Sequence, residues 1–470
     1  MIMSNSKKPA LLGICLIPVA LALAGPAQAI DLREAVRTAV GNNPEINQAA
    51  RNRDAVDEER RQAMGLFGPR LSVEGSAGIR RLENTTRRAL GIANETLYPL
   101  EADLSAEQLI YDFGRADGEL HRQAARTDAA AARVEERSEF VALNVSRSYI
   151  DYLLQQRIVA SAQDNLAFHE RLVADLREGV ARGSISVADQ QQAEERLQAA
   201  RARLTEALEE QENAAIAFHR VAGVQLGQAT MPPNISGSLP PDLDQAVDIA
   251  RANNPRVLEA MADLDAASAV SYAARAELAP RISAEGRVRV GDDIDGFRGA
   301  TEDYLGRIVV RWTFFSSGIN QARVREAASR ESEQRFRVHQ AGREAEADVR
   351  TAWNRLESQT RLVGELEQQS RVSDDLLISY REQFNVGRRS LLDVLDAQNT
   401  RYNVQVQADT ARLSQIYAQY RVLAASNRLL DALGVDLPSA AVSNARAHHR
   451  ARINDPAAVM EPRIPYGPGN

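Results

Sequence analysis

Two acidic residues stand three positions apart in the stretch GRRSLLDVLDAQNT, which covers residues 387–400. In a helix Asp393 and Asp396 would lie on the same side, because residues three apart are neighbours on a helix surface. Such a carboxylate pair could act as a general acid and base, bind a metal ion, cap a helix or line an acidic opening. The elements around the pair decide among these roles.

A helix cap explains only one of the two aspartates. Ser390 precedes Asp393 by three residues and Ser186 precedes Asp189 by the same spacing, as in a capping box. Asp396 has no such explanation, and Gln192 stands at its position in the first of two repeats described below. An enzyme dyad has little support, because no histidine or ligand-binding motif accompanies the pair. The six histidines are scattered, so neither a metal site nor a cofactor is expected.

The first 29 residues have the composition of a secretory leader. Lys7 and Lys8 precede an apolar run that ends in the small-residue sequence AQA, so a signal peptide is predicted over residues 1–29. Cys15, the only cysteine, and both lysines of the chain lie in this leader. The mature chain would therefore have no disulfide, no thiolate ligand, no Cys nucleophile and no phosphate-binding or Schiff-base lysine.

Charge and hydropathy narrow the classes of partner. The formal net charge of −7 becomes −9 when the two leader lysines are removed, and no basic patch stands out. Nucleic acid is therefore not an expected partner. After the leader there is no apolar run of about 18 residues, so any part that crosses a membrane would be built from β-strands.

The chain contains one unit twice. The linker MPPNISGSLPP at 231–241 joins a first repeat, predicted over residues 30–230, to a second over residues 242–438. Residues 439–470 contain four prolines and are predicted to be a disordered, periplasmic tail. The clearest matches are DLREAVRTAVGNNPEI (31–46) with DLDQAVDIARANNPRV (242–257), and PRLSVEG (69–75) with PRISAEG (280–286).

Each unit contains two stretches in which apolar and polar residues alternate, as they do in strands with two different faces. Each stretch has about ten residues, the length of a tilted strand that crosses a bilayer. A soluble sandwich with one wet face is the alternative. Expected on the apolar face are Leu71, Val73, Leu100, Leu104, Ile282, Val288, Tyr304, Ile308 and Val310, while Tyr304, Trp312, Phe314 and Phe315 are expected near strand ends as an aromatic girdle.

Four strands per chain are too few for a membrane barrel, since the smallest single-chain barrels have eight. Open strand edges are not tolerated in hydrocarbon. Strands must therefore be shared among copies, and three copies would supply twelve.

Two long helices are expected after each strand pair. Between Glu119 and Glu178 there is neither Gly nor Pro, which allows about 90 Å of helix. Gly183 and Gly387 are expected to end the long helices at their far turns, and Asn-Asn-Pro is expected to end the first helix of each unit with Asn in a left-handed conformation. A coiled-coil seam is predicted at Ala193, Leu197, Ala200, Leu204, Ala207, Ala214, Phe218 and Val221.

Taken together, these features resemble the TolC family of outer-membrane export channels. The resemblance covers roughly residues 30–438 and implies an α+β membrane protein. Its expected fold is a trimeric 12-stranded outer-membrane β-barrel with four strands per chain, continued by a long periplasmic α-helical coiled-coil barrel. The motifs that carry the resemblance are the repeated halves, Asn-Asn-Pro, QLIYDFG (108–114), TFFSSG (313–318) and VGRRSLLDVLDAQNTRYN (386–403).

The resemblance also implies roles for the tip residues. Asp393 and Asp396 would form an acidic ring at the periplasmic entrance of the tunnel. Arg389 of the second-repeat turn and Asp189 of the first-repeat turn would form a latch that closes the entrance. Phe384 stands where the family has a tyrosine that assists this latch, so that hydroxyl hydrogen bond is absent here.

The implied function is a passive exit duct in the outer membrane of a Gram-negative bacterium, carrying proteins or small molecules from an inner-membrane pump. The implied partners are two more copies of the chain, a periplasmic adaptor (membrane fusion) protein, an ABC or proton-driven transporter and outer-membrane lipid. Ile14 before Cys15 argues against a lipid anchor, which favours type I secretion over multidrug efflux. A periplasmic adaptor or structural coiled-coil protein is the alternative from another class, but adaptors lack four lipid-type strands.

Overall fold

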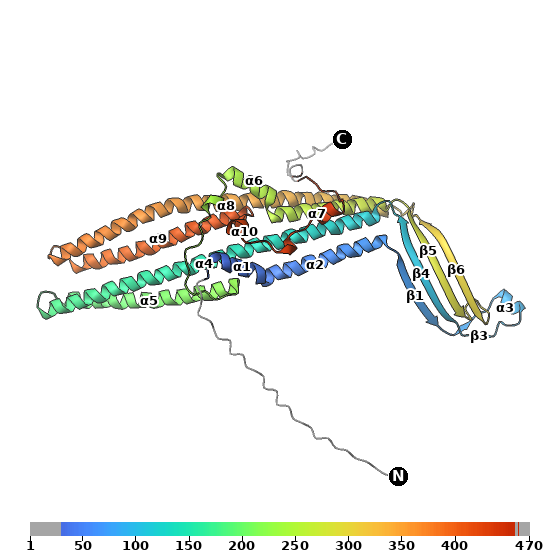
Figure 1. Cartoon of the computed structure of the whole chain (residues 1–470), viewed down its shortest axis with the longest axis horizontal. Helices are drawn as coiled ribbons and strands as arrows, with labels where there is room; N and C mark the ends of the chain where they lie inside the picture. The colour runs from blue at the N-terminus through green and yellow to red at the C-terminus, as the bar shows by residue number, and fades with distance from the viewer. Residues whose placement is uncertain (1–29, 456–458, 460–470) are drawn as a thin grey trace, which may run out of the picture.

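The computed structural model describes residues 30–455 and 459. The predicted signal peptide with Cys15, and the prolines of the tail from Pro456 on, lie outside the described residues. The described chain is elongated, with helices along most of its length and a curved sheet at one end (Figure 1). Within this part of the chain, no helix has both the length and the hydrophobicity that membrane crossing requires.

The predicted four strands are confirmed and form one antiparallel sheet in the order β1-β4-β5-β6. The strand pairs of the two repeats meet through β4 and β5, while β1 and β6 form the edges. The sheet is a single layer (Figure 1), which excludes the sandwich. The strands are β1 (Arg70–Ala77), β4 (Leu100–Tyr111), β5 (Arg281–Asp292) and β6 (Ala300–Arg311).

The two faces of the sheet differ as the alternation predicts. Val73, Leu104, Val288 and Tyr304 lie in one row across all four strands. Val73 and Tyr304 are 77% and 69% exposed in the single chain, so this apolar face has no protein cover of its own. The other face carries cross-strand ion pairs: Arg281–Glu107 (3.2 Å), Arg287–Asp303 (2.8 Å), Arg307–Glu285 (2.8 Å) and Arg289–Glu101.

The aromatic side chains gather mostly at the end of the sheet that meets the helices. Trp312, Phe314 and Phe315 follow directly after β6, and all three are exposed. Tyr304 instead lies inside β6, so it is not a strand-end residue. Tyr111 and Phe113 add an aromatic pair at the same end, with ring centroids 4.7 Å apart.

A small folded loop between β1 and β4 was not predicted. It contains β2 (Arg80–Arg81), α3 (Thr85–Ala89) and β3 (Thr96–Leu97). Arg87 is buried and donates hydrogen bonds to the carbonyls of Ile92 (2.7 Å) and Glu95 (3.1 Å). Elements of two to five residues are too short to show a period in the sequence, and one buried guanidinium organises them.

Two long helical hairpins run from the sheet to the far end of the molecule (Figure 1). Their first helices, α4 and α8, each have 67 residues, which corresponds to about 100 Å. The predicted seam is confirmed, since its alanines, Leu197 and Phe218 are buried, while Leu204 and Val221 are partly buried. The hairpins are α4 (Arg115–Ala181) with α5 (Val187–Ala222), and α8 (Ile319–Asn385) with α9 (Leu391–Ala425).

Shorter helices complete the duplicated element order. Asn43 and Asn254 do not take the expected left-handed conformation, because the residue before proline is pushed toward extended backbone. Their φ angles are −63° and −64°, and their side chains accept from the N–H groups of Glu45 (2.8 Å) and Arg256 (3.0 Å). Each therefore caps the following helix. The helices are α1 (Leu32–Asn42), α2 (Pro44–Met64), α6 (Leu243–Asn253) and α7 (Pro255–Ala276), with 3-10 turns at Gly65–Phe67 and Ser236–Ser238.

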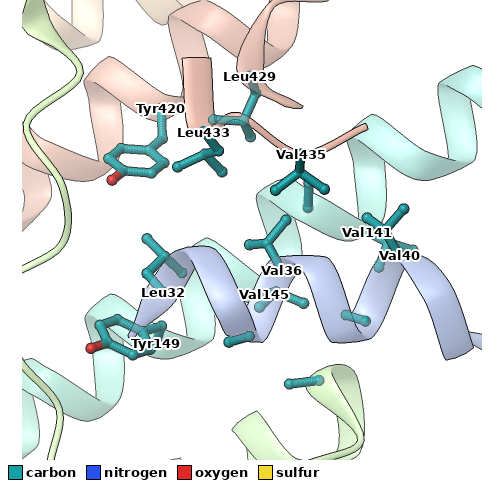
Figure 2. Packing of buried hydrophobic residues seen from close by; sticks show 14 of the residues in the cluster. Leu32, Val36, Val40, Val141, Val145, Tyr149, Tyr420, Leu429, Leu433 and Val435 are labelled. Carbon is teal, nitrogen blue, oxygen red and sulfur yellow. The ribbon is translucent and has the colours of Figure 1, made fainter. Parts of the chain in front are cut away.

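The largest core lies where α1 packs along the middle of α4 (Figure 2). Leu32 and Val36 of α1 meet Val145 of α4 and Leu433 of the short helix α10 (Leu429–Leu433). The segment between the repeats is tied to this core, because Tyr420 donates a hydrogen bond to the carbonyl of Pro233 (2.9 Å). Burial of this apolar surface fixes the two repeats to each other.

The predicted disorder of the tail is wrong for residues 439–455. This segment, called the strap below, contains a 3-10 turn (Ser439–Ala441) and α11 (Ala445–His448). Arg446 pairs with two buried carboxylates, Asp128 of α4 (2.8 Å) and Asp265 of α7 (2.5 Å). The four prolines that suggested disorder all lie after the strap. Composition could not reveal that two distant helices present acids to it.

Candidate functional site

The two hairpin tips are built in the same way. Gly183 and Gly387 follow α4 and α8, and both have positive φ angles, 74° and 73°. An L side chain is strained in this conformation, so glycine lets the chain reverse there. The predicted breaks at these glycines are confirmed.

Serine then starts the second helix of each hairpin, as predicted. Ser186 and Ser390 accept from the N–H groups of Asp189 (3.1 Å) and Asp393 (3.3 Å). Only the second tip has the reciprocal bond, in which the N–H of Ser390 donates to Asp393 Oδ2 (3.2 Å). Asp393 thus completes a capping box at the start of α9.

Asp393 and Asp396 lie on the same side of α9 but differ in their partners. The hydroxyl of Ser390 donates to Asp393 Oδ2 (2.8 Å), and Arg389 lies 3.7 Å from the same oxygen. Chiefly through the Ser390 hydrogen bonds, and also through Arg389, the pKa of Asp393 is lowered. Asp396 is exposed and makes no hydrogen bond or ion pair with the described residues of its own chain. It therefore offers an uncompensated negative charge.

Arg389 is held by its own hairpin. Its guanidinium lies over the ring of Tyr380, 4.2 Å from the centroid, and its Nε donates to Gln383 Oε1 (3.1 Å). Asp189 instead accepts from the hydroxyl of Ser186 (2.7 Å). The expected Arg389–Asp189 pair is absent among the contacts within the described chain, and it stays a prediction for contacts between copies.

Phe384 lies at the second tip, where its ring makes apolar packing contacts. It is partly buried against Leu391 and Leu395 of α9 and residues of the first hairpin. Sequence reasoning missed Tyr380 and Gln383 as partners of Arg389. The available signal was their position, nine and six residues before Arg389, across a turn marked by Gly387.

A buried polar layer joins the two hairpins above the tips. Gln398 of α9 donates to Asn165 Oδ1 of α4 (2.8 Å), and both residues are buried. His169 lies one turn further along α4, and its Nδ1 has no hydrogen-bond partner. Burial, aided by the nearby charges of Arg203 and Arg196, lowers the pKa of His169 to about 4. His169 is therefore neutral at neutral pH. Among residues 30–455 and 459, no group of acidic, His or Cys side chains is arranged to hold a metal ion.

Comparison with known proteins identifies the family. The model of the family described as outer membrane efflux protein matches residues 35–224 and, a second time, residues 246–435. The chain belongs to the outer membrane efflux protein family. The two matches fall on the two repeats, so the predicted duplication and the resemblance to TolC-like channels are both confirmed.

Individual relatives agree with this assignment. The outer membrane efflux protein BepC of Brucella suis is 24% identical over 412 residues, covering 86% of this chain and 87% of BepC. The alkaline protease secretion protein AprF of Pseudomonas aeruginosa is 22% identical over 413 residues, covering 86% of this chain and 85% of AprF. The crystal structure of CusC matches with a TM-score of 0.72 at 20% identity, covering 92% of this chain and 99% of CusC.

Members of this family are passive homotrimeric channels that work with a periplasmic adaptor protein and an inner-membrane transporter. As a member of this family, the protein is a channel of the outer membrane and not an enzyme. The long helical hairpins form its periplasmic part. The expected location, partners and fold class are confirmed.

Proposed function

We propose that three copies of this chain form the exit duct of a type I secretion system and conduct protein substrates from an ABC transporter to the outside. The similarity to AprF, whose name assigns it to alkaline protease secretion, supports this choice of cargo class. The similarity to the efflux protein BepC supports small-molecule efflux with a proton-driven pump as the second candidate.

The geometry that carries the proposal is the division of the chain into a sheet and long hairpins. The apolar row from Val73 to Tyr304 suits contact with lipid, and the ion-paired face suits a wet lumen. Helices of 67 residues span about 100 Å, which would carry the duct far into the periplasm. A duct of this kind needs no cofactor, since the pump supplies the energy.

We further propose that Asp393 and Asp396 form the acidic ring at the periplasmic entrance. Two carboxylates from each of three copies give six, and such a ring attracts cations and filters what enters. Asp396 would contribute most, because its charge has no partner among residues 30–455 and 459, whereas Asp393 contacts Ser390 and Arg389.

The latch between Arg389 and Asp189 is a further part of this proposal. Tyr380 and Gln383 hold the guanidinium of Arg389 at the surface of the tip in the single chain. In the trimer, Arg389 would reach Asp189 of a neighbouring copy, with Phe384 packed beneath it. Release of this pair would allow the entrance to widen.

Removal of the gene from the producing bacterium tests the assignment. Under the type I proposal, one or more secreted proteins disappear from the culture medium, and return when the intact gene is restored. Susceptibility to antibiotics and dyes should stay within about twofold of the parent, because efflux would be intact. Increased drug susceptibility with an unchanged set of secreted proteins would instead support efflux and reject type I secretion.

A further inference from the structure

A cavity of about 400 Å³ lies between the strap and the helices just below the sheet. It is formed by α4, α7 and α8, with the strap covering one side. The end of α7 at Ala276 is only five residues before the start of β5 at Arg281. The residues that matter for its chemistry are His121, Ser271, Tyr272, Arg275, Arg450 and Arg452.

The cavity carries excess positive charge. Arg275, Arg450 and Arg452 line it, and none of them makes an ion pair within residues 30–455. Asp265 also faces the cavity, but its negative charge is neutralised by the ion pair with Arg446. The side-chain amide of Asn454 donates a further hydrogen bond to its carboxylate (2.7 Å). The remaining acid is Glu331, whose carboxylate accepts from the hydroxyl of Ser268 (3.2 Å). Three unpaired guanidinium groups thus face one carboxylate, which favours an anionic ligand.

A buried hydroxyl provides an independent sign of a ligand. Ser271 lines the cavity, is 2% exposed, and its Oγ has no hydrogen-bond partner among the described residues. A buried polar atom without a partner is costly, so such atoms usually have one in the functional state. Because Oγ itself is buried in this conformation, the side chain must turn toward the cavity before its hydroxyl can donate to an oxygen of a bound anion.

The cavity lies at the level of the membrane surface. The indole N–H of Trp312 donates to the carbonyl of Leu278 (3.0 Å), three residues after Arg275. Tryptophan at the border of an apolar strand region lies at the headgroup level. Arg275 is one helical turn away from this level, about 5 Å along the axis.

The cavity also faces away from the lumen, if the proposed duct is correct. The helices below the sheet lie in the order α2-α4-α7-α8, and the strap crosses one face of this layer. A strap inside the tube would obstruct transport, so this face is the outer one. The cavity centres on α7, between α4 and α8, and not on the outer edges of α2 and α8 where copies would meet.

We propose that this cavity binds the phosphate of an anionic phospholipid headgroup from the inner leaflet of the outer membrane. Guanidinium groups bind phosphate oxygens through paired, charge-assisted hydrogen bonds. The hydroxyls of Ser271 and Tyr272 add neutral donors, and basic pockets at a membrane surface select anionic headgroups. The lipid would hold the strap against the helices next to the bilayer.

Native mass spectrometry of the intact trimer in detergent tests this site, with phosphatidylglycerol as the probe. The unmodified trimer should retain one phosphatidylglycerol per chain. The combined variant Arg275→Gln/Arg450→Gln/Arg452→Gln should weaken binding on the order of 100-fold, since several charge-assisted hydrogen bonds are lost. Ser271→Ala should weaken it by about 3- to 10-fold, the effect of one neutral hydrogen bond.

The matched control is Arg343→Gln/Arg355→Gln/Arg361→Gln, which removes three exposed and unpaired arginines from α8 and should bind lipid normally. Equal lipid retention by the two triple variants would overturn the proposal. So would binding of inorganic phosphate as tight as that of the lipid, because the source would then be a soluble anion. Conductance of the same trimers in planar bilayers separates the outcomes: a conducting trimer without bound lipid rejects only this site, whereas a trimer that does not conduct rejects the duct.

Discussion

Asp393 and Asp396 carry the same charged group on the same side of α9, but within the described part of the chain only Asp393 has partners. Asp393 therefore has a structural role at the start of α9 in addition to its charge. Asp396 contributes charge alone. This difference allows the acidic ring to be tested without disturbing the turn, because asparagine at 393 can still accept from Ser390.

The double variant Asp393→Asn/Asp396→Asn should conduct through planar bilayers but resist block by divalent cations. A ring of negative charges concentrates cations at the entrance, and the double variant lacks this ring. Roughly tenfold more Mg²⁺ should therefore be needed to block half of the current. Gln192→Asp, at the equivalent position of the first repeat, should strengthen the block. Asp375→Asn, which removes an exposed charge from α8 near the same tip, is the control. Identical block in all variants would remove the ring from the mechanism.

Glu139 of α4 is a second acid whose environment matters. It is 7% exposed, its Oε1 accepts from the N–H of Leu430 (3.1 Å), and its Oε2 has no hydrogen-bond partner in the part of the chain that the structure describes. Burial raises the pKa of Glu139 to about 8, against the hydrogen bonds from Leu430 and Leu429. The folded state therefore binds a proton more tightly than the unfolded state. The contribution of protonated Glu139 to the stability of the fold is complete below about pH 4.5 and is lost as the pH rises toward about 8.

Glu139→Gln should remove this dependence, because glutamine keeps the acceptor for Leu430 without a charge. Between pH 5 and about pH 8, the unfolding midpoint of the unmodified protein should fall more steeply than that of the variant. Thermal unfolding followed by circular dichroism measures this difference. Glu365→Gln, an exposed acid on α8 without an ion pair, should leave the slope unchanged. Equal slopes for Glu139→Gln and the unmodified protein would contradict the assignment.

At the scale of elements, the contact between α4 and α7 joins the two repeats below the sheet. Gly118 of α4 makes this contact possible, because a Cβ there would lie 2.7 Å from Ala273 Cβ and 3.0 Å from the carbonyl of Ala269. Gly364 of α8 is also inside a helix, but a Cβ there would meet no atom of the described residues within 4 Å. Substitution by alanine should therefore have opposite effects on stability at the two glycines.

Gly118→Ala should destabilise the fold by about 1–3 kcal/mol, because the helices must separate to admit a methyl group. Gly364→Ala should stabilise it by about 0.5–1 kcal/mol, since alanine is favoured in a helix interior. Urea unfolding of both variants gives the comparison. A stabilising effect of Gly118→Ala would show that α4 and α7 are not in close contact there.

At the scale of the whole molecule, the sheet determines the assembly. β1 and β6 have no partner on their outer sides among the described residues. Backbone groups on such edges need hydrogen-bond partners in hydrocarbon, and another copy of the chain supplies them. β1 of one copy should therefore pair with β6 of the next.

Cysteine cross-linking tests this pairing. Because the only cysteine of the sequence lies in the predicted leader, introduced pairs would be the only thiols of the mature chain. Ser72→Cys is combined in turn with a cysteine in place of Leu305, Arg307 or Val309, which lie on the same face of the sheet as Ser72. One of these combinations should give covalent dimers and trimers on a denaturing gel. Ser72→Cys/Ser105→Cys should instead close within one chain, since these hydroxyls are 2.7 Å apart. Covalent dimers and trimers at none of the β6 positions would contradict the β1–β6 seam.

Features that depend on nearby residues were determined by the sequence alone. The strand faces, the two long helices of each repeat and the turns at Gly183 and Gly387 follow from period and from turn chemistry within a few residues. The duplication was visible because the same local motifs occur twice in the sequence. The capping role of Asp393 needed only Ser390 three residues before it.

The tertiary structure alone decided which distant residues meet. The strap is ordered because Asp128 and Asp265, more than 150 residues before Arg446, lie where its guanidinium can reach both. The burial of Glu139 and the basic cavity beside Ser271 have the same origin. Local period reports which side of an element is apolar, but the free energy of a buried charge depends on the groups that the whole fold brings within a few ångströms of it.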